Sequence, residues 1–303
     1  MDASRALSAP KALAAWWLAI RPGTLTIAMV PVVVGSALAV ADGAPFDPTV
    51  ALAALAAAVL IQIGTNLQND VGDWQRGADS GDRLGPPRAT SLGWLSPAQV
   101  RRGAIVACGL AFALGGYLVW RGGWPIVLIG VSAITVGLAY TSGRRPIAYT
   151  AFGELFVFLF FGLVAVGGAY YLQTLEVGRS AVIAGALIGM LAAAVLVVNN
   201  YRDIDSDRRA GKHTVAVCFG AGFARRAYAF LVLAPFPGLP LLARTADAGA
   251  RVMLALAVLP WAVRLVRQIY TAPPGAWLNR LLGETALLQL AFGLLLAAAL
   301  SVG

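Results

Sequence analysis

Nine long apolar stretches, separated by short polar segments, follow one another along the chain. They cover approximately residues 24–41, 50–69, 99–119, 124–141, 152–173, 181–201, 222–242, 250–265 and 281–301. A helix needs about 20 mostly apolar residues to cross the hydrocarbon core of a bilayer. The stretches are continuous and rich in Ala and Leu, whereas the strands of a membrane barrel alternate apolar and polar residues. The pattern therefore predicts an all-α fold, a polytopic transmembrane helical bundle of about nine helices.

Two of the nine stretches are irregular. The seventh contains Pro235, Pro237 and Pro240, and we expect a kink or a break there because proline removes a helical hydrogen bond. The eighth is short and lies between Arg251 and Arg264, which makes it the weakest of the predicted spans.

The N-terminal region carries a shorter apolar run that ends at Arg21-Pro22. No small-residue cleavage site follows it, so we interpret residues 1–23 as a retained interfacial segment and not as a removed signal peptide. Residues 1–303 as a whole are expected to form a single transmembrane domain. Composition agrees, since 59% of the residues are hydrophobic and 12% are charged. Soluble domains have about 45–50% apolar and about 25% charged residues.

The positive charges lie mostly on one side of the predicted bundle. Of the 23 Lys and Arg residues, 19 fall in the N-terminal segment or in the connections on the same side. The other side carries the remaining four, Arg121, Arg179, Arg244 and Arg251. The positive-inside rule makes the basic side cytoplasmic, so the N-terminus faces the cytoplasm. This asymmetry explains the net charge of +9 without nucleic acid as a partner.

Acidic residues concentrate in two segments of that basic side. Seven of the 14 acids lie there: Asp70, Asp73, Asp79, Asp82, Asp203, Asp205 and Asp207. If the second helix continues far enough, Asn66, Asp70 and Asp73 share one of its faces, with Asn69 beside them. In the second segment a helical period places Asn199, Asp203 and Asp207 on one face, with Asn200 at its edge. Asp205 points away from that face.

Carboxylates stacked in this way need a cation. Two such charges about 6 Å apart repel each other by roughly 3 kcal/mol at an effective dielectric constant near 20. Mg²⁺ takes oxygen ligands and typically joins one or two carboxylates to substrate phosphates. The basic residues in and around these segments also suit phosphate: Arg76, Arg83, Arg88, Arg202, Arg208, Arg209 and Lys212. The alternative is a pair of solvated loops, but two matching clusters, each led by Asn, favour a magnesium site.

Both segments resemble a known family. Asn69-Asp70-x-x-Asp73 and Asp203-x-x-x-Asp207 are similar to the paired aspartate motifs of the UbiA superfamily of intramembrane prenyltransferases, which hold magnesium and the diphosphate of an isoprenoid donor. The longer string from Asn69 to Arg88 resembles the branch that prenylates 1,4-dihydroxy-2-naphthoate in menaquinone synthesis. The sequence departs from the family where an acid is expected four residues after Asp73, since Gly77 stands there and Asp79 follows instead.

The resemblance implies magnesium-dependent transfer of a polyprenyl group from polyprenyl diphosphate to 1,4-dihydroxy-2-naphthoate. The products are demethylmenaquinol, carbon dioxide and diphosphate, and the enzyme lies in a bacterial cell membrane with its site towards the cytoplasm. The implied catalytic residues are Asp70, Asp73, Asp203, Asp207 and Tyr140. The implied metal ligands are Asn66, Asn69, Asp70, Asp73, Asn199, Asn200, Asp203 and Asp207. The implied substrate-binding residues are Arg76, Asp79, Arg83, Arg88, Arg144, Arg145, Glu154, Arg202 and Lys212.

Several of these residues have a second interpretation. Tyr140 also suits the aromatic belt at the membrane interface, and Arg144 and Arg145 suit a topology signal. Glu154 begins the fifth span, where it either contacts the acceptor or pairs with an Arg. Glu284, on the ninth span, is expected to pair helices.

Two further groups are expected to lie outside the site. Phe156, Phe158, Phe160 and Phe161 are spread around a regular helix, which favours packing against lipid or within the bundle. His213, the only histidine, is expected at the surface.

Alternative functions remain open at this point. A membrane transporter with divalent-cation loops is one, although transporters usually place polar groups at the bilayer midplane and not at one edge. Within the enzyme interpretation, 4-hydroxybenzoate, homogentisate or haem are alternative acceptors.

Overall fold

The computed structural model describes residues 11–77, 84–271 and 273–301 of the chain. Within these ranges every regular element is a helix. The first four spans are α2 (Pro22–Ala41), α3 (Pro48–Gln75), α4 (Pro97–Gly122) and α5 (Trp124–Ala139). The fifth combines α6 (Gly153–Val157), the π-helix η2 (Phe158–Val164) and α7 (Ala165–Thr174), and the sixth is α8 (Arg179–Arg202). The last three are α10 (Val215–Leu233) with α11 (Pro235–Thr245), the 3₁₀-helix η3 (Gly249–Val258) with α12 (Leu259–Thr271), and α13 (Leu278–Ser301).

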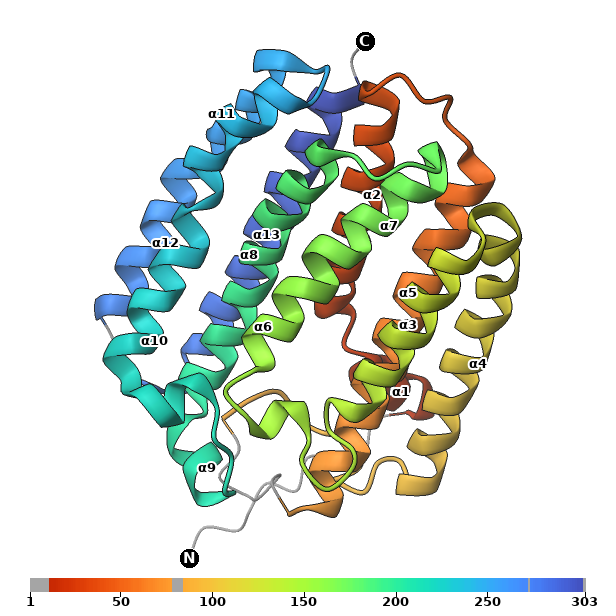
Figure 1. The fold of residues 1–303 in the computed structure, drawn as a ribbon. Helices are drawn as coiled ribbons and strands as arrows, with labels where there is room; N and C mark the ends of the chain where they lie inside the picture. Colours follow the sequence, from red (N-terminus) through yellow and green to blue (C-terminus); the bar gives the residue numbers. More distant parts are fainter. Residues whose placement is uncertain (1–10, 78–83, 272, 302–303) are drawn as a thin grey trace, which may run out of the picture.

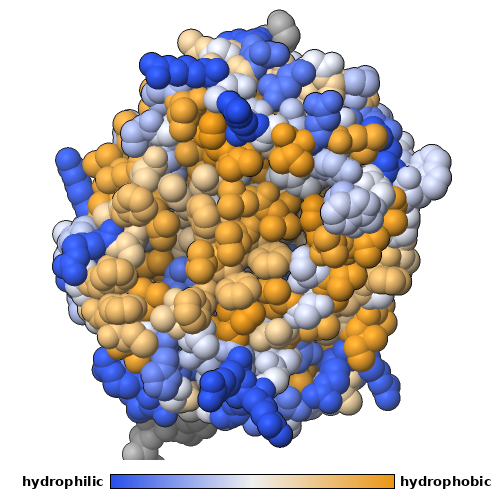
Figure 2. Space-filling model, viewed as in Figure 1, coloured by the Kyte–Doolittle hydropathy of each residue, from blue (hydrophilic) through white to orange (hydrophobic). Residues whose placement is uncertain are grey.

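The described residues thus form helices at all nine predicted places, and the predicted fold class is confirmed. Eight of these helical stretches are long and apolar enough to cross a membrane, while α5 is an apolar helix of 16 residues. Short elements occupy the connections, namely α1 (Ala12–Ile20), the 3₁₀-helix η1 (Ile147–Tyr149) and α9 (Ile204–Arg209). The protein is therefore a multi-pass membrane protein. In Figure 2 an apolar band crosses the middle of the surface, with most hydrophilic residues gathered toward the two ends.

Proline marks the irregular points at which three helices begin. The irregularity expected in the seventh span is slight: α10 ends at Leu233, Ala234 keeps a helical backbone with a φ of −60° and a ψ of −27°, and α11 starts at Pro235. In the eighth span the 3₁₀ segment gives way to α12 at Leu259-Pro260. Arg21 has a left-handed backbone with a φ of 54°, and Pro22 opens α2. A proline in the first turn of a helix loses no hydrogen bond, because the N–H it lacks would be unpaired there anyway.

The helices bring both acidic segments to the same end of the bundle. The ends of α3, α5 and α8 meet near α1 and α9, whereas α11 lies at the opposite end (Figure 1). In the interior, α13 packs along α2 and α8, while α3 packs along α4. In Figure 1 the fifth span lies between α8 and the α3–α5 side, and its η2 and α7 parts pack on α8 and α2.

The fifth span approaches α8 through glycines. A Cβ added at Gly162 would lie 2.4 Å from the Gly185 carbonyl oxygen and 2.7 Å from the Cα of Gly189. Gly162 lies within the π-helix η2, so two backbones touch here without side chains between them. Close contact of this kind is typical of membrane helix pairs.

We predict that Gly162→Ala destabilises the protein, by roughly 1–3 kcal/mol, because an added methyl group overpacks the η2–α8 contact. The matched control is Gly167→Ala on α7, where an added Cβ meets nothing within 4 Å. Thermal unfolding of both variants in detergent measures the difference. Equal midpoints for the two variants would show that the contact does not constrain the fold.

We also predict that the end of the bundle with the acidic segments faces the cytoplasm, because most Lys and Arg residues lie there. In a chain without Cys108 and Cys218, a cysteine at Arg208 is expected to be protected from an impermeant thiol reagent in intact cells. A cysteine at Glu176, exposed at the opposite end, is expected to react. The reverse labelling pattern would invert the topology.

Candidate active site

The two acidic segments lie on opposite walls of one cavity. Helix α3 continues past Asp73 to Gln75, as the helical spacing required. Helix α8 ends at Arg202, Asp203 caps it, and α9 carries Asp207. The break after α8 preserves the spacing, because the Asp207 amide still donates to the Asp203 carbonyl oxygen at 2.7 Å.

The cavity between these walls has a volume of about 710 Å³. Its polar end is lined from both sides by amides and carboxylates: Asn66, Asn69, Asp73, Asn199, Asn200, Asp203 and Asp207. Tyr140, at the end of α5, lines the same region. These residues are eight of the predicted site residues, and the structure brings them together.

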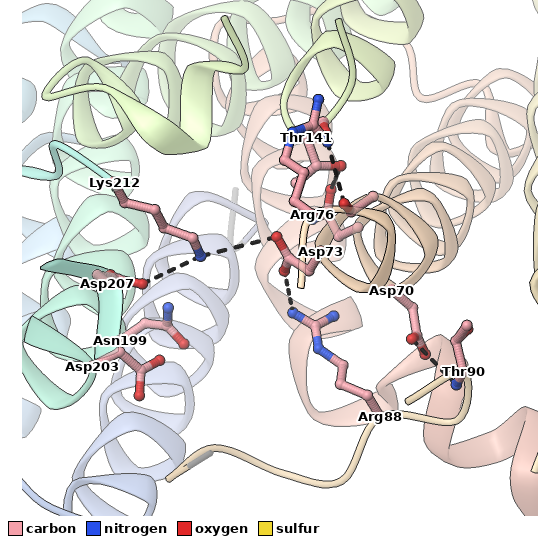
Figure 3. A network of polar contacts seen from close by, with 12 residues as sticks. Asp70, Asp73, Arg76, Arg88, Thr90, Thr141, Asn199, Asp203, Asp207 and Lys212 are labelled. Carbon is pink, nitrogen blue, oxygen red and sulfur yellow. Dashed lines mark hydrogen bonds and ion pairs between the residues drawn. The ribbon is translucent and has the colours of Figure 1, made fainter. Parts of the chain in front are cut away.

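Lys212 lies between the two walls. Its ammonium nitrogen is 3.2 Å from a carboxylate oxygen of Asp207 and 3.9 Å from Oδ1 of Asp73 (Figure 3). Burial lowers the pKa of Lys212, but Asp73 and Asp207 outweigh this effect and the pKa is raised. Lys212 is therefore charged at neutral pH and links the α3 wall to the α9 wall.

At Asp207, the neighbouring Lys212 does not offset the cost of burying the carboxylate. Burial raises the pKa of Asp207 to about 6, although Lys212 opposes the shift, and Asp203 and Asp73 raise it further. Asp203 itself is held by Arg202, whose guanidinium is 2.9 and 2.5 Å from the two carboxylate oxygens.

Asp73 is only partly compensated as well. Its Oδ2 accepts from Arg88 at 2.8 Å, but its buried Oδ1 has no hydrogen-bond partner among the described residues. A buried carboxylate oxygen in that state fits a cation or a water as its missing partner. Together with the raised pKa of Asp207, it means that the donor set suits a hard divalent cation bound between the walls.

No group of three or more His, Cys, Asp or Glu side chains in the described ranges lies close enough to hold a metal by itself. The predicted ligands are divided between two walls, and Arg88, Arg202 and Lys212 each contact at least one of their carboxylates. Amide oxygens and the oxygens of a bound substrate would have to complete the coordination.

Asp70 does not join the cavity, contrary to the expectation of a shared face with Asn66 and Asp73. Its oxygens accept backbone N–H groups from Ala89 at 3.2 Å and Thr90 at 3.3 Å, and the side chain points away from Asp73 (Figure 3). At 100° per residue, Asp70 lies at the edge of the helical stripe that contains the cavity-lining amides and Asp73. The spacing therefore predicted correctly that α3 carries the site. It was wrong in centring the cavity-facing side of α3 on Asn66, Asp70 and Asp73, because Asp70 lies outside that side.

Asn66 lines the cavity, but its amide is engaged elsewhere. Its Nδ2 donates to the Ile20 carbonyl oxygen at 2.9 Å and to the Thr24 hydroxyl at 3.0 Å. Asn66 thereby ties α3 to the start of α2. Asn69, one turn before Asp73, accepts from the Thr141 hydroxyl at 2.8 Å.

The predicted cations fall into two groups. Arg88, Arg202 and Lys212 line the cavity. Arg76 instead donates to backbone carbonyl oxygens of Thr141 and Gly143, both at 2.6 Å. Arg144 and Arg145 are exposed and do not line the cavity. Asp79 and Arg83, like Asp82, lie outside the described residues.

The two intramembrane glutamates have different surroundings. Glu154 pairs with no Arg in the described part of the chain; its Oε1 accepts from Asn200 at 2.9 Å. Glu284 joins two helices as expected, since it accepts from Arg264 of α12 at 2.5 Å and from Arg280 of α13 at 2.9 Å. His213 is exposed, also as expected.

Beyond its polar end the cavity is apolar and long. On α3 alone its lining runs from Asp73 to Ala54, 19 residues or about 29 Å of helix. Phe156, Phe160 and Phe161 all line it, so the expectation that these rings lie outside the site is wrong. The π-helix is the reason, because its i→i+5 bonding brings Phe161 toward the face of Phe156. The expected packing within the bundle is confirmed for Phe161, which also packs against a buried apolar cluster.

Several polar residues of the cavity lining were not among the predicted site residues: Arg21, Thr24, Gln62, Thr65, Thr141, Ser206 and Asn279. Asn279, in the first turn of α13, accepts from Arg202 at 2.7 Å and donates to the Leu84 carbonyl oxygen at 2.7 Å. It lies far from both acidic segments in the sequence, and no local pattern marked it. Arg21 and Thr24 also line the cavity, and their signal in the sequence was the Arg21-Pro22-x-Thr24 string, where the family resemblance begins.

Residues 28–283 match the UbiA prenyltransferase family. The chain is 32% identical over 297 residues to the 1,4-dihydroxy-2-naphthoate octaprenyltransferase of Haemophilus influenzae, covering 95% of this chain and 96% of the relative. It is 39% identical over 225 residues to the protein of the same name from Escherichia coli, covering 72% of this chain and 73% of the relative.

Among solved structures, the fold is similar to that of a UbiA homologue from Archaeoglobus fulgidus bound to DMAPP and Mg²⁺. The TM-score is 0.67 at 16% identity, and the match covers 95% of this chain and 99% of that chain. The fold, the match of residues 28–283 and the curated relatives agree: this chain belongs to the UbiA prenyltransferase family and is a membrane prenyltransferase.

Proposed function

We propose that this enzyme transfers a polyprenyl group from polyprenyl diphosphate to 1,4-dihydroxy-2-naphthoate, with loss of carbon dioxide and with Mg²⁺ as cofactor. The observation that carries the proposal is the shape and polarity of the cavity. Its polar end presents carboxylates and cations, and beyond Asn66 the lining follows α3 to Ala54, about 18 Å further along the helix. A substrate that fits such a space has a charged head and a long hydrocarbon chain.

The length of the apolar part suits several isoprene units. Each unit adds four carbon–carbon bonds of about 1.5 Å to the chain, or about 5 Å when extended. The part of the cavity beyond the polar end therefore accommodates about three or four units in a straight line, and a longer chain would have to continue into the bilayer or fold back. The relatives that are called octaprenyltransferases support a long-chain donor for this enzyme too.

The polar end suits the diphosphate head of that donor. Asp73, Asp203 and Asp207, with Asn69 and Asn199, would hold Mg²⁺ between the two walls, and Asn66 and Asn200 lie beside them. When bound, the metal would supply Lewis-acid stabilisation of the leaving diphosphate. Arg88 and Lys212 are the cations nearest Asp73, so they would contact diphosphate oxygens from either side.

Bond breaking and bond making then follow the polarity of the cavity. The allylic C1–O bond breaks, and its electron pair leaves with diphosphate toward the cations. An electron-rich ring carbon of the acceptor bonds to C1, and the carboxyl group is lost as carbon dioxide. Tyr140 lies at the polar end, and Phe156 and Phe160 belong to the apolar lining. The apolar lining keeps water from the allylic cation before the acceptor reacts.

Other parts of the earlier site hypothesis have supporting roles in this proposal. Arg202 orients Asn199 and Asp203 rather than substrate, since it donates to both. Arg76 supports the turn at Thr141 that bonds Asn69.

A transporter would be expected to carry its polar groups at the bilayer midplane, whereas here they gather at one end of the bundle.

We predict that Asp73→Asn, Asp203→Asn and Asp207→Asn each lower the rate on the order of 100-fold or more, since each removes a charge that the metal needs. Asp205→Asn is the matched control. Asp205 is exposed, and within the described ranges its ion pair is with Arg208, so its variant should keep nearly full activity. Diphosphate release as a function of Mg²⁺ concentration measures all four variants. A comparable loss at Asp205 would refute the assignment of the α8–α9 wall.

The acceptor is tested with purified enzyme, a long-chain prenyl diphosphate, Mg²⁺ and one acceptor at a time. We predict that 1,4-dihydroxy-2-naphthoate yields a decarboxylated prenyl naphthoquinol, identified by mass spectrometry. Under the same conditions 4-hydroxybenzoate should yield at least about 100-fold less product, which corresponds to roughly 2.7 kcal/mol in transition-state binding. A preference for 4-hydroxybenzoate would leave the family in place and overturn the acceptor.

A further inference from the structure

One acid of the first aspartate motif has no part in the proposed reaction. Asp70 is 1% exposed, yet it does not line the cavity. Figure 3 shows its carboxylate turned away from Asp73, Asp203 and Asp207. A buried carboxylate needs compensating partners, and those of Asp70 identify what it does.

The hydrogen-bond partners of Asp70 belong to the loop that leads into α4, and the positive charge of Arg21 also stabilises its carboxylate. Its Oδ2 accepts the Ala89 N–H at 3.2 Å, and its Oδ1 accepts the Thr90 N–H at 3.3 Å. Both carboxylate oxygens are therefore engaged by backbone donors. To ligate a metal beside Asp73, the side chain would have to turn toward Asp73, which would leave the two N–H groups unpaired in a buried environment.

The loop residues that Asp70 contacts form a compact unit, which we call the strap (residues 84–96). Within the strap, the amides of Trp94 and Leu95 both donate to the Ala89 carbonyl oxygen, at 2.9 and 3.2 Å. Ala89 and Leu95 are buried in one apolar cluster with Leu67 and Val71 of α3. Because the strap is internally bonded, fixing its backbone at Ala89 and Thr90 also fixes the residue that precedes them.

That preceding residue is Arg88, which lines the cavity. Arg88 is 7% exposed and donates to Asp73 at 2.8 Å. Asp70 and Asp73 lie on α3 less than one turn apart. Asp70 accepts hydrogen bonds from the strap backbone, and Asp73 accepts one from the Arg88 side chain. The far end of the strap is held separately, where Asn279 donates to the Leu84 carbonyl oxygen.

We propose that Asp70 is a positioning residue and not a metal ligand: it holds the strap so that Arg88 meets the diphosphate at the polar end of the cavity. The proposal rests on the proposed function for the identity of that diphosphate. Asp70 acts through two backbone hydrogen bonds, whereas Asp73 acts through its charge. The two acids of the motif therefore differ in kind, although the sequence presents them as equivalent.

The experiment compares Asp70→Asn with Asp73→Asn in the full-length enzyme. Asp70→Asn keeps the size of the side chain, but its one amide oxygen can accept a hydrogen bond where the carboxylate had two oxygens. We expect its kcat/KM for prenyl diphosphate to fall about 10-fold, while the Mg²⁺ concentration for half-maximal activity stays within 2-fold of wild type. Asp73→Asn should raise that Mg²⁺ concentration by 10-fold or more. An equal rise in Asp70→Asn would overturn the proposal and make Asp70 a ligand.

Hydrogen exchange supplies a readout that does not depend on catalysis. The amides of Ala89 and Thr90 should exchange faster in Asp70→Asn than in wild type, with peptides of α10 and α12 unchanged. In Asp73→Asn the same two amides should stay protected. Unchanged protection in Asp70→Asn would refute the anchoring role. The same measurement on Asp70→Ala, which keeps neither acceptor oxygen, should show a larger increase in exchange.

A double-mutant cycle with Arg88→Gln connects the anchor to its target. If Asp70 acts through Arg88, Asp70→Asn should reduce kcat/KM by less than 3-fold once Arg88 is already Gln. Full multiplication of the two single losses would overturn the proposed route.

Binding of Mg²⁺-pyrophosphate to the wild type separates this inference from the proposed function. If the wild type fails to bind it, the function fails, whereas if it binds and the cycle is additive, only the role of Asp70 fails.

Discussion

The site depends on the balance of buried charge where two helix ends approach each other. Asp73 from α3 and Asp207 from α9 lie across one cavity, and Lys212 and Arg88 only partly neutralise them. Carboxylates in such surroundings are costly unless they are paired. Burial raises the pKa of Asp207, and Oδ1 of Asp73 has no hydrogen-bond partner among the described residues, with Lys212 3.9 Å away. A divalent cation with a diphosphate is the chemistry that suits this arrangement.

The helices around the cavity place these charges at one end of it and apolar side chains along the remainder. Helix α3 carries Asp73 at one end of a lining that reaches Ala54, so a single rigid element spans both parts of the substrate path. The π-helix η2 contributes rings to this lining while its glycine contacts α8. Close backbone contact of the fifth and sixth spans therefore fixes the cavity wall at the same point where the aromatic side chains enter it.

Two breaks in the helical backbone, at Arg21 and Asp203, lie at the cavity. The left-handed residue Arg21 separates α1 from α2 and lines the cavity. Asp203 ends α8 and begins α9, so one residue is both a helix break and a wall of the site. Such breaks leave backbone groups without helical partners, and side chains such as Asn66, which bonds the Ile20 carbonyl oxygen, satisfy them.

The sequence by itself determined the spans, the end of the bundle that carries the site and the two walls around Asp73 and Asp207, because hydropathy and helical period are local properties. It also indicated the irregularity before Pro235, since proline acts on its own helix. Only the tertiary structure decided that Asp70 binds the strap, that Arg144 lies at the surface and that Asn279 joins the site. Those outcomes depend on which distant backbone lies against each side chain. A helical spacing gives the direction of a side chain to within a fraction of a turn, and in this protein that fraction separates Asp73 from Asp70.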